Sequence, residues 1–383
     1  MADLTTHYLG LTLKNPIIVG SAGITGTAEL ITRASDAGAG AVVMKSLGDR
    51  NWVSPRFRIL KTKQDDAKTI TFYSVEGNSK LSEEEYAEEV AKAKAKVDIP
   101  IIASASCLDD DSWIRRAKLL EQAGADALEA DISCPHGAHV LINGNSLSEV
   151  GRVTKLLKSV VSMPIIPKLT PQASDPLAVA FEAEAAGADA ITAFNRFTGL
   201  DVDIRAQAPI LHGGLAGHGG PWAIYYTMRW VSAMYLKLKI PISSSGGVFR
   251  YEDVVKMLLV GATTVQTCTA IILNGYAVVT GMVRGLERYM LEMGHKTLGE
   301  FRGLAAKRLQ NAATIDRGRC FRAKIDANSC IDCGQCARVC YHDASTPSTS
   351  GGYQINESCV GCGLCVDICP TGAISILEME RVQ

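Results

Sequence analysis

The stretch Ala123-Gly124-Ala125-Asp126-Ala127 joins the end of a helical pattern to a buried apolar run. Similar junctions, with small residues around a glycine, recur at residues 37–41, 186–190 and 260–264. A glycine at this point lets the helix end in the left-handed conformation, because glycine has no Cβ to oppose it. The small neighbours let the helix end pack closely against the strand that follows. The sequence therefore predicts a repeated unit of helix, tight turn and buried strand.

Short apolar runs rich in β-branched residues alternate with helical patterns along most of the chain. The runs predicted as strands are 16–19, 41–45, 101–105, 127–132, 165–168, 190–194, 242–244 and 264–268. Helical periodicity is clearest in 83–97, which follows the cap candidate Ser82, and in 113–122, 147–160 and 176–186. This alternation predicts an α/β fold, a (β/α)8 TIM barrel, with a doubly wound sheet as the alternative. Residues at the carboxyl ends of the strands are then the first candidates for function.

The composition is that of an ordinary globular protein. Of 383 residues, 47% are hydrophobic, and 39 basic against 40 acidic residues give a net charge of −1. The sequence has no basic stripe of the kind that would suggest nucleic acid or an anionic membrane as a partner. The first ten residues lack the basic and apolar regions of a secretory signal, so we expect a cytoplasmic protein. Residues 257–283 carry no charge, but glycine, glutamine and asparagine divide them, and we expect buried elements there rather than a membrane span.

Eight of the twelve cysteines lie between positions 330 and 369, in two runs of the form C-x2-C-x2-C-x3-C. This is the spacing of bacterial ferredoxins that hold two 4Fe–4S clusters, in which the fourth cysteine of each run binds the cluster of the other run. The predicted ligands of cluster 1 are Cys330, Cys333, Cys336 and Cys369. The predicted ligands of cluster 2 are Cys340, Cys359, Cys362 and Cys365. A pair of zinc sites or a set of disulfides is the alternative.

The chain is expected to fall into a catalytic barrel over residues 1–312, a linker over 313–325 and a ferredoxin-like domain over 326–383. A helical pattern over 298–310 is expected to lead into the linker. The last 58 residues hold seven acidic and two basic residues, a net charge of −5. This acidic surface suits docking to a redox partner.

The barrel lacks the glycine-rich fingerprint of dinucleotide-binding folds but has a candidate phosphate site. Ser244-Ser245-Gly246-Gly247 follows the seventh predicted strand, and Thr267-Cys268-Thr269 follows the eighth. In barrels this pair of loops often offers backbone N–H groups to a phosphate. Lys45 and Lys168 end two other strands, where their charge could stabilise a reduced flavin. An ion pair with an acidic residue of the barrel is the alternative for either lysine.

Residues 127–137 read ALEADISCPHG, which resembles the ExNxSCPHG stretch of dihydropyrimidine dehydrogenases and the NxSCPN stretch of dihydroorotate dehydrogenases. Other stretches that resemble this family are VSPRF at 53–57, IPKLTP at 166–171, GGLAG at 213–217 and SGGV at 245–248. With the cysteine runs, the resemblance covers essentially the whole chain and is closest to the bacterial two-subunit dihydropyrimidine dehydrogenases. It implies an FMN barrel that adds or removes two hydrogens across a ring C–C bond, with hydride passing through flavin N5.

The resemblance also implies roles for individual residues. Cys134 matches the acid/base cysteine of the family, and an unperturbed thiol titrates near pH 8.5, so it could exchange a proton around neutral pH. A buried structural cysteine is the alternative. The positions that match FMN-contacting residues are Ala22, Gly23, Lys45, Ser46, Lys168, Asn195, Gly217, Gly246, Gly247, Cys268 (through its backbone) and Thr269.

The predicted substrate site departs from the family pattern. Pyrimidine-reducing relatives hold the ring with asparagines, but Ser74 and Asp131 stand at two of these positions. Asn195 is retained, and Arg196 follows it where a threonine is usual. We therefore expect Ser74, Asp131, Asn195 and Arg196 to contact substrate, with Glu76 and its loop neighbour Asn78 as weaker candidates. An internal Asp131–Arg196 pair without substrate contact is the alternative.

These observations predict an FMN and iron–sulfur oxidoreductase that acts on a C=C or CH–CH bond of a small cyclic substrate, with an anion as one hypothesis because arginine suits one. Reduction of uracil and thymine is an alternative, as are a non-catalytic electron-transfer subunit and an aldolase-type barrel with Lys168 as Schiff base. Because no dinucleotide fingerprint is present, we expect a separate FAD/NAD(P)H reductase subunit or a ferredoxin as electron partner. A homodimer or hetero-oligomer is the expected assembly.

Overall fold

The computed structural model describes residues 2–48, 56–61, 70–132, 146–210, 215–349 and 351–379. Two compact units make up the chain, Met1–Leu309 and Gln310–Gln383. The division between them falls slightly earlier than the end of the barrel expected at residue 312.

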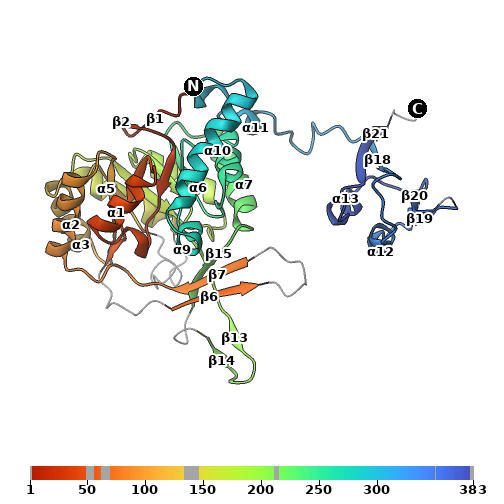
Figure 1. The fold of residues 1–383 in the computed structure, drawn as a ribbon. Coiled ribbons are helices and arrows are strands. Elements are labelled where there is room, and N and C mark those ends of the chain that lie inside the picture. The colour runs from red at the N-terminus through yellow and green to blue at the C-terminus, as the bar shows by residue number, and fades with distance from the viewer. Residues whose placement is uncertain are drawn as a thin grey trace. The chain divides into compact units, whose positions relative to one another are not determined.

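The first unit contains a closed barrel of eight parallel strands, which confirms the predicted fold class (Figure 1). The strands are β3 (Ile17–Val19), β4 (Ala41–Val43), β8 (Ile101–Ser106), β9 (Ala127–Ala130), β10 (Ile165–Leu169), β11 (Ile191–Ala193), β16 (Ile242–Ser245) and β17 (Thr264–Thr267). They pair in the order β4-β3-β17-β16-β11-β10-β9-β8, and β4 also pairs with β8. The two-residue β5 (Leu47–Gly48) pairs with the end of β8. Because the ring closes, the doubly wound alternative is wrong.

Helices follow the strands and surround the barrel (Figure 1). They are α1 (Ala28–Asp36), α2 (Glu83–Lys96), α3 (Asp110–Gln122), α5 (Ser146–Val160), α6 (Pro176–Ala185), α7 (Ala223–Tyr235), α8 (Tyr251–Leu259), α9 (Thr269–Asn274) and α10 (Ala277–Met293). Local sequence fixes where they begin. Ser82 accepts from the N–H of Glu85 while the Glu85 carboxylate accepts from the N–H of Ser82, which forms a capping box at the start of α2.

Two segments differ from or refine the sequence prediction. The helix expected over 298–310 is instead a 3-10 turn, Leu298–Glu300, and the short α11 (Leu304–Lys307), because Gly303 between them has a φ of +77°. The uncharged segment 257–283 is divided among the end of α8, β17, α9 and the start of α10. Within the described ranges, no helix has the length and apolar character that crossing a membrane would require.

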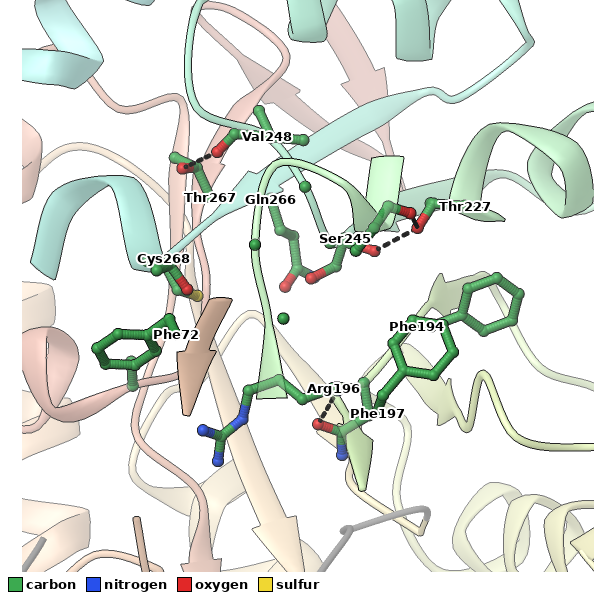
Figure 2. A pocket seen from close by; sticks show the side chains of 18 of the residues that line it. Phe72, Phe194, Arg196, Phe197, Thr227, Ser245, Val248, Gln266, Thr267 and Cys268 are labelled. Atoms are coloured by element: carbon green, nitrogen blue, oxygen red, sulfur yellow. Dashed lines mark hydrogen bonds between the residues drawn. The ribbon is translucent and has the colours of Figure 1, made fainter. Parts of the chain in front are cut away.

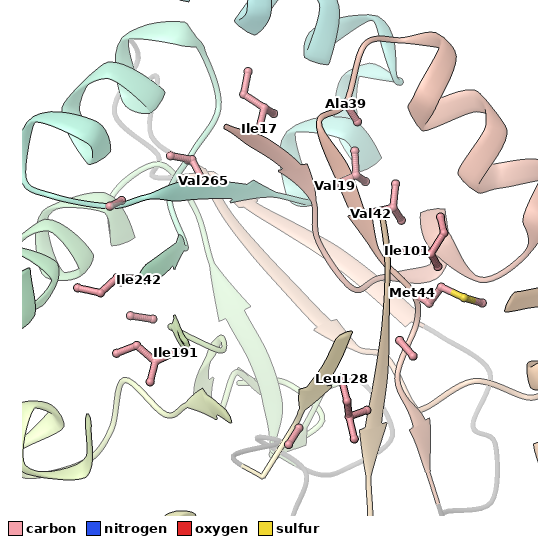
Figure 3. Close-up of a cluster of buried hydrophobic side chains, with 14 of the residues drawn as sticks. Ile17, Val19, Ala39, Val42, Met44, Ile101, Leu128, Ile191, Ile242 and Val265 are labelled. Atoms are coloured by element: carbon pink, nitrogen blue, oxygen red, sulfur yellow. The ribbon is translucent and has the colours of Figure 1, made fainter. Parts of the chain in front are cut away.

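The main apolar core lies between the barrel and its helices. Outward-facing strand residues such as Ile17, Val42 and Leu128 are buried and belong to one cluster with the helix residues Ile31 and Val90 (Figure 3). Burial of side chains of this size stabilises the fold by roughly 1.5–3 kcal/mol each. This packing holds the strands in place and leaves their alternate residues facing the barrel interior.

The barrel interior is apolar at the amino-terminal ends of the strands and polar beyond them. A second buried cluster joins Ile18, Val43 and Ile102 to Tyr8 and Leu13 of a hairpin, formed by β1 (Thr6–Tyr8) and β2 (Leu11–Leu13). Further along the strands, the buried polar residues are Ser104, Glu129, Lys168, Thr192, Ser243 and Gln266. The hairpin therefore closes one end of the barrel, and polar side chains lie toward the other.

A separate antiparallel sheet forms from segments that follow the barrel strands. Its order is β12 (Phe197–Gly199), β15 (Ala216–Gly219), β7 (Ile70–Val75) and β6 (Arg56–Lys61). The register places Ser74 of β7 opposite Gly217 of β15. A hairpin of β13 (Val202–Asp203) and β14 (Ala208–Pro209) projects beyond this sheet (Figure 1).

The second unit is small and built around its cysteines. Its elements are β18 (Cys320–Ile325), α12 (Gln335–Val339), β19 (Ser345–Pro347), β20 (Tyr353–Ile355), α13 (Leu364–Ile368) and β21 (Ile374–Met379). Strand β18 pairs with β21 and lies inside the segment 313–325 expected to be a linker. The reason is the alternation of Phe321, Ala323 and Ile325 with Arg322 and Lys324, a strand pattern that turns Ala323 into the core.

The glycine junctions that predicted the repeated unit have the expected backbone. Gly38, Gly124, Gly187 and Gly261 have φ angles of +100°, +89°, +90° and +110°. A Cβ added at Gly124 would meet no atom within 4 Å, whereas one at Gly261 would come within 2.1 Å of Cγ of Tyr235. The two positions therefore share the backbone constraint but differ in available space.

We predict that Gly261→Ala destabilises the barrel more than Gly124→Ala. The positive φ alone costs about 1–2 kcal/mol for alanine, and only position 261 adds a collision with a ring. The measurement is the free energy of unfolding of the first unit in denaturant, with Gly124→Ala as the matched control. Equal losses for the two variants would contradict the prediction.

Candidate active site and cluster sites

A pocket of about 850 Å³ lies at the carboxyl ends of the barrel strands (Figure 2). Barrels place their active sites at this face. The lining residues that the sequence singled out are Ala22, Glu76, Lys168, Asn195, Arg196, Gly246, Gly247, Cys268 and Thr269. The fold thus gathers candidates from six separate segments of the chain.

Six other predicted residues each contact a residue that lines the pocket. They are Gly23, Lys45, Ser46, Ser74, Asp131 and Gly217. Asn78 instead lies against Gly48: a Cβ added to Gly48 would come within 1.7 Å of Asn78 Nδ2. Cys134 is in the segment 133–145 and lies outside the described residues.

The loop after β16 has the properties of a phosphate cradle. Gly246 and Gly247 have φ angles of +107° and +82°, and a Cβ on Gly247 would come within 2.2 Å of the backbone N of Ile224. Within the described part of the chain, the N–H groups of Gly246, Gly247 and Val248 donate to no acceptor. Free backbone donors on a loop that only glycine can form fit an anion such as a phosphate.

Another buried group at the pocket lacks a partner. Gln266 lines the pocket and is 2% exposed, and its Oε1 accepts no hydrogen bond within the described residues. Its Nε2 is fixed by the Glu129 carboxylate at 2.9 Å, so the amide is held in one orientation. A buried acceptor of this kind is explained when a ligand supplies a donor.

Both predicted lysines are in ion pairs. Lys168 Nζ lies 2.9 Å from Glu129 Oε1 inside the barrel, and Lys45 Nζ lies 3.3 Å from Glu76 Oε1 at the pocket. Burial lowers the pKa of Lys168, but the carboxylates of Glu129 and Asp131 outweigh burial and raise the pKa above its ordinary value. A permanently charged amine is a poor nucleophile, so this geometry disfavours the aldolase alternative.

Asp131 lies in a nearly dry polar environment. Its Oδ1 accepts from Asn195 Nδ2 at 2.8 Å and its Oδ2 from the Ser46 hydroxyl at 3.4 Å, and the residue is 7% exposed. Burial raises the pKa of Asp131, and the charge of Lys168 lowers it only in part. Asp131 therefore orients Asn195, which lines the pocket.

Arg196 extends across the pocket wall (Figure 2). It donates to the Ser74 hydroxyl, and a Cβ on Gly217 would come within 2.6 Å of its Cζ, so Gly217 gives the guanidinium its space. No ion pair within 4.0 Å joins Arg196 to Asp131 among the described residues. Burial alone would raise the pKa of Glu76, but the charges of Lys45 and Arg196 bring it below its ordinary value.

The sequence analysis missed an aromatic wall of the pocket. Phe194, Phe197 and His218 line it, and Phe197 packs on Tyr226 and Trp222 with ring centroids 5.1 and 5.5 Å apart. The spacing of Phe194 and Phe197 after a barrel strand was an available signal. His218, in contrast, reaches the pocket only through the pairing of β15 with β12 and β7, which the sequence does not reveal.

Cys268 lines the pocket beside Gly20, where an added Cβ would lie 2.7 Å from its Sγ. Burial raises the pKa of Cys268 to about 11. Its thiol therefore stays protonated near neutral pH, which agrees with the prediction that this residue contributes through its backbone.

The eight cysteines of the two runs in the second unit are free thiols that surround two cavities. One, of about 340 Å³, is lined by Cys330, Cys333, Cys336 and Cys369. The other, of about 410 Å³, is lined by Cys340, Cys359, Cys362 and Cys365. These are the two crossed ligand sets expected from the spacing. Within the described ranges, no three His, Cys, Asp or Glu side chains form a site for a single metal ion.

Comparison with known proteins gives matches over both units. Residues 3–290 match the family model described as dihydroorotate dehydrogenase, and residues 323–376 match the 4Fe-4S dicluster domain. The "NAD-dependent dihydropyrimidine dehydrogenase subunit PreA" of Escherichia coli K12 is 32% identical over 93% of this chain and 87% of that protein. The catalytic subunits of "dihydroorotate dehydrogenase B (NAD(+))" from Pyrococcus furiosus and Pyrococcus abyssi are 35% and 34% identical, over 80% and 79% of this chain and 99% of each relative.

The environment of Asp131 predicts how stability depends on pH. An acid whose pKa is raised on folding destabilises the folded state as pH rises above its ordinary pKa of about 3.8. We therefore expect Asp131→Asn to raise the free energy of unfolding at pH 8, and the gain to shrink as pH falls toward 4. The measurement is denaturant unfolding of the first unit across this range.

Glu121 provides the control of opposite sign. Its carboxylate accepts from the hydroxyl and N–H of Ser162 and from the N–H of Met163, and these hydrogen bonds lower its pKa. Glu121→Gln should therefore lose stability at pH 8, with the loss fading toward pH 4. If both variants changed stability in the same direction, the account of Asp131 would be wrong.

Proposed function

Since the chain belongs to the dihydroorotate dehydrogenase family and is an oxidoreductase acting on CH–CH groups, we propose that it is an FMN- and iron–sulfur-dependent enzyme for a small cyclic substrate. It reduces a C=C bond of the ring or oxidises the corresponding CH–CH bond. The observation that carries this proposal is the convergence of the glycine cradle, Lys168, Asn195 and Arg196 on one pocket at the barrel mouth.

The residues present at the pocket fit FMN. Among the described residues, no acceptor takes the N–H groups of Gly246, Gly247 and Val248 and no donor reaches Gln266 Oε1, so these groups are available to the flavin and its phosphate, and Lys168 adds a buried positive charge. Flavin, when bound, supplies a hydride at N5 for exchange with a carbon of the substrate. The further residues proposed to hold it are Ala22, Gly23, Lys45, Ser46, Asn195, Gly217, Cys268 and Thr269.

Other side chains are proposed to transfer the proton and to bind the substrate. Cys134 is proposed to give a proton to the second carbon of the C=C bond, or to take it in the reverse direction. Asn195, held by Asp131, offers a donor and an acceptor to the ring. Arg196 is the group for an anionic substituent, and Ser74 and Glu76 complete the pocket on the same side.

Electrons are proposed to travel through two 4Fe–4S clusters, one held by Cys330, Cys333, Cys336 and Cys369 and one by Cys340, Cys359, Cys362 and Cys365. The four-cysteine cavities and the match to a dicluster domain support this. The electron partner is proposed to be an FAD/NAD(P)H reductase subunit or a ferredoxin, in a homodimeric or hetero-oligomeric assembly. The name of the Escherichia coli relative, a subunit of an NAD-dependent enzyme, supports such a partner.

Reduction of uracil or thymine is the second candidate, favoured by the name of the same relative. The pocket favours an anionic ring instead. Arg196 facing a neutral ring edge gains no charged partner from the substrate, whereas a carboxylate would give it a charge-assisted and bidentate pair.

The cofactor content tests the proposed function. We expect about eight iron and eight sulfide per chain, as two four-iron clusters require, and one FMN that is released on denaturation. The measurement is metal, sulfide and flavin analysis after anaerobic purification. Zinc in place of iron, or a preparation without flavin, would refute the proposal.

Replacing Cys134 tests the proton transfer. Cys134→Ser should retain FMN and accept electrons, while substrate turnover falls by about 10²–10⁴-fold, the usual contribution of a positioned acid or base. Cys107→Ser is the matched control, because Cys107 follows the neighbouring strand β8 and has no proposed role. Loss of flavin from Cys134→Ser would indicate a structural thiol.

Replacing Arg196 tests the substrate class. Arg196→Thr should raise KM for an unsaturated ring acid, because the charge-assisted pair is lost, without changing the flavin or iron content. Arg205→Thr, on the exposed hairpin that follows β12, is the control and should leave KM unchanged. Wild-type turnover of uracil at rates typical of a working enzyme would contradict the anion hypothesis.

A further inference from the structure

We propose that Glu129 is a positioning residue that fixes the ammonium group of Lys168 at the pocket and keeps it charged. This inference rests on the proposed flavin site, because the charge of Lys168 matters there. It gives a role to a residue of the stretch 127–137 for which the sequence analysis proposed none, and this residue lies on the barrel strand β9.

Both carboxylate oxygens of Glu129 are fully engaged. Oε1 accepts from Lys168 Nζ at 2.9 Å, and Oε2 accepts from the Thr192 hydroxyl at 2.8 Å and from Gln266 Nε2 at 2.9 Å. Gln266 Nε2 in turn lies 3.2 Å from the Ser243 hydroxyl. Glu129 is 0% exposed, so four strands of the barrel determine its position.

Lys168 differs from Glu129 in that it reaches the pocket. Lys168 lines the pocket wall, whereas Glu129 does not. A carboxylate buried this deeply is strongly unfavourable without a partner, and the same holds for the ammonium. The Glu129 carboxylate therefore favours the charged form of Lys168, and the positive end of the pair lies at the pocket wall.

The titratable groups around this pair come from several elements. Asp131 at the end of β9 and Cys268 after β17 face Lys168, and Tyr8 of the hairpin and Tyr86 of α2 face Glu129. Both tyrosines have strongly raised pKa values because they are buried, so they stay neutral. Among the described carboxylic acids, Glu129 and Asp131 raise the pKa of Lys168.

Removing the charge of Glu129 has two opposite consequences for a flavin in this pocket. At neutral pH the field of Lys168 is no longer offset by a neighbouring carboxylate, which favours the more negative, reduced flavin. At higher pH Lys168 loses the proton that Glu129 helped to retain, and this advantage disappears. A residue with a purely structural role would produce no such pH-dependent difference.

The test is the midpoint potential of the flavin in the holoenzyme from pH 6 to pH 10, for wild type and Glu129→Gln. At pH 7 the preference for reduced over oxidised flavin should be about tenfold greater in the variant than in wild type. For a two-electron couple, this makes the midpoint potential of the variant about 30 mV more positive. The difference should decline toward pH 10. Thr192→Val, which removes a hydrogen bond but no charge, is the control and should run parallel to wild type. A Glu129→Gln curve parallel to wild type would overturn the proposal.

A second measurement, of unfolding stability, tests the proposal even if Glu129→Gln loses its flavin. The single variant leaves the buried Lys168 ammonium without the Glu129 carboxylate and should raise the unfolding equilibrium constant of the first unit on the order of a hundredfold or more. The double variant Glu129→Gln, Lys168→Met should recover most of this loss, because the ammonium that had lost the Glu129 carboxylate is also removed. A double variant no more stable than the single one would contradict the proposal. Absence of flavin from the wild-type protein would instead refute the proposed function.

Discussion

The ion pair between Glu129 and Lys168 is the constraint on which the rest of the site depends. A buried pair of this kind adds little net stability, because removing both charges from water costs about as much as their attraction returns. The pair instead contributes specificity, because it excludes other arrangements of the polar side chains. With Thr192 and Gln266 as further partners, Glu129 permits one arrangement of the polar side chains inside the barrel, and that arrangement directs a positive charge to the pocket.

The barrel accommodates this polar interior by separating it from an apolar end. The hairpin residues Tyr8 and Leu13 close the amino-terminal ends of the strands together with Ile102, and helix packing buries the outer faces. The polar layer inside the barrel is therefore covered by apolar side chains at the hairpin end and around the outside. At the pocket end, the wall also includes segments outside the barrel, such as the sheet that carries Ser74.

Most of the fold followed from local sequence. The junction at Gly124 and the capping box at Ser82 are short-range features, and the structure has them as predicted. The grouping of the cysteines of the two runs around two cavities likewise agrees with their spacing. The contacts of Glu129 and Arg196 could not be predicted in this way, because they depend on the register between strands far apart in the chain. A Glu in the otherwise apolar run at 127–130 was the available signal. The range 298–310 has a helical pattern, but Gly303 interrupts it.

The central claim is that this barrel passes electrons from iron–sulfur clusters to a C=C bond through a flavin at its mouth. The most direct test is to reduce the anaerobic holoenzyme with dithionite, remove the excess, and add unsaturated ring acids and pyrimidines one at a time. The account predicts that the absorption band of oxidised flavin returns with at least one ring acid and that the dihydro product accumulates in stoichiometric amount. A flavin band that returns with none of these compounds, although oxygen restores it, would contradict the account.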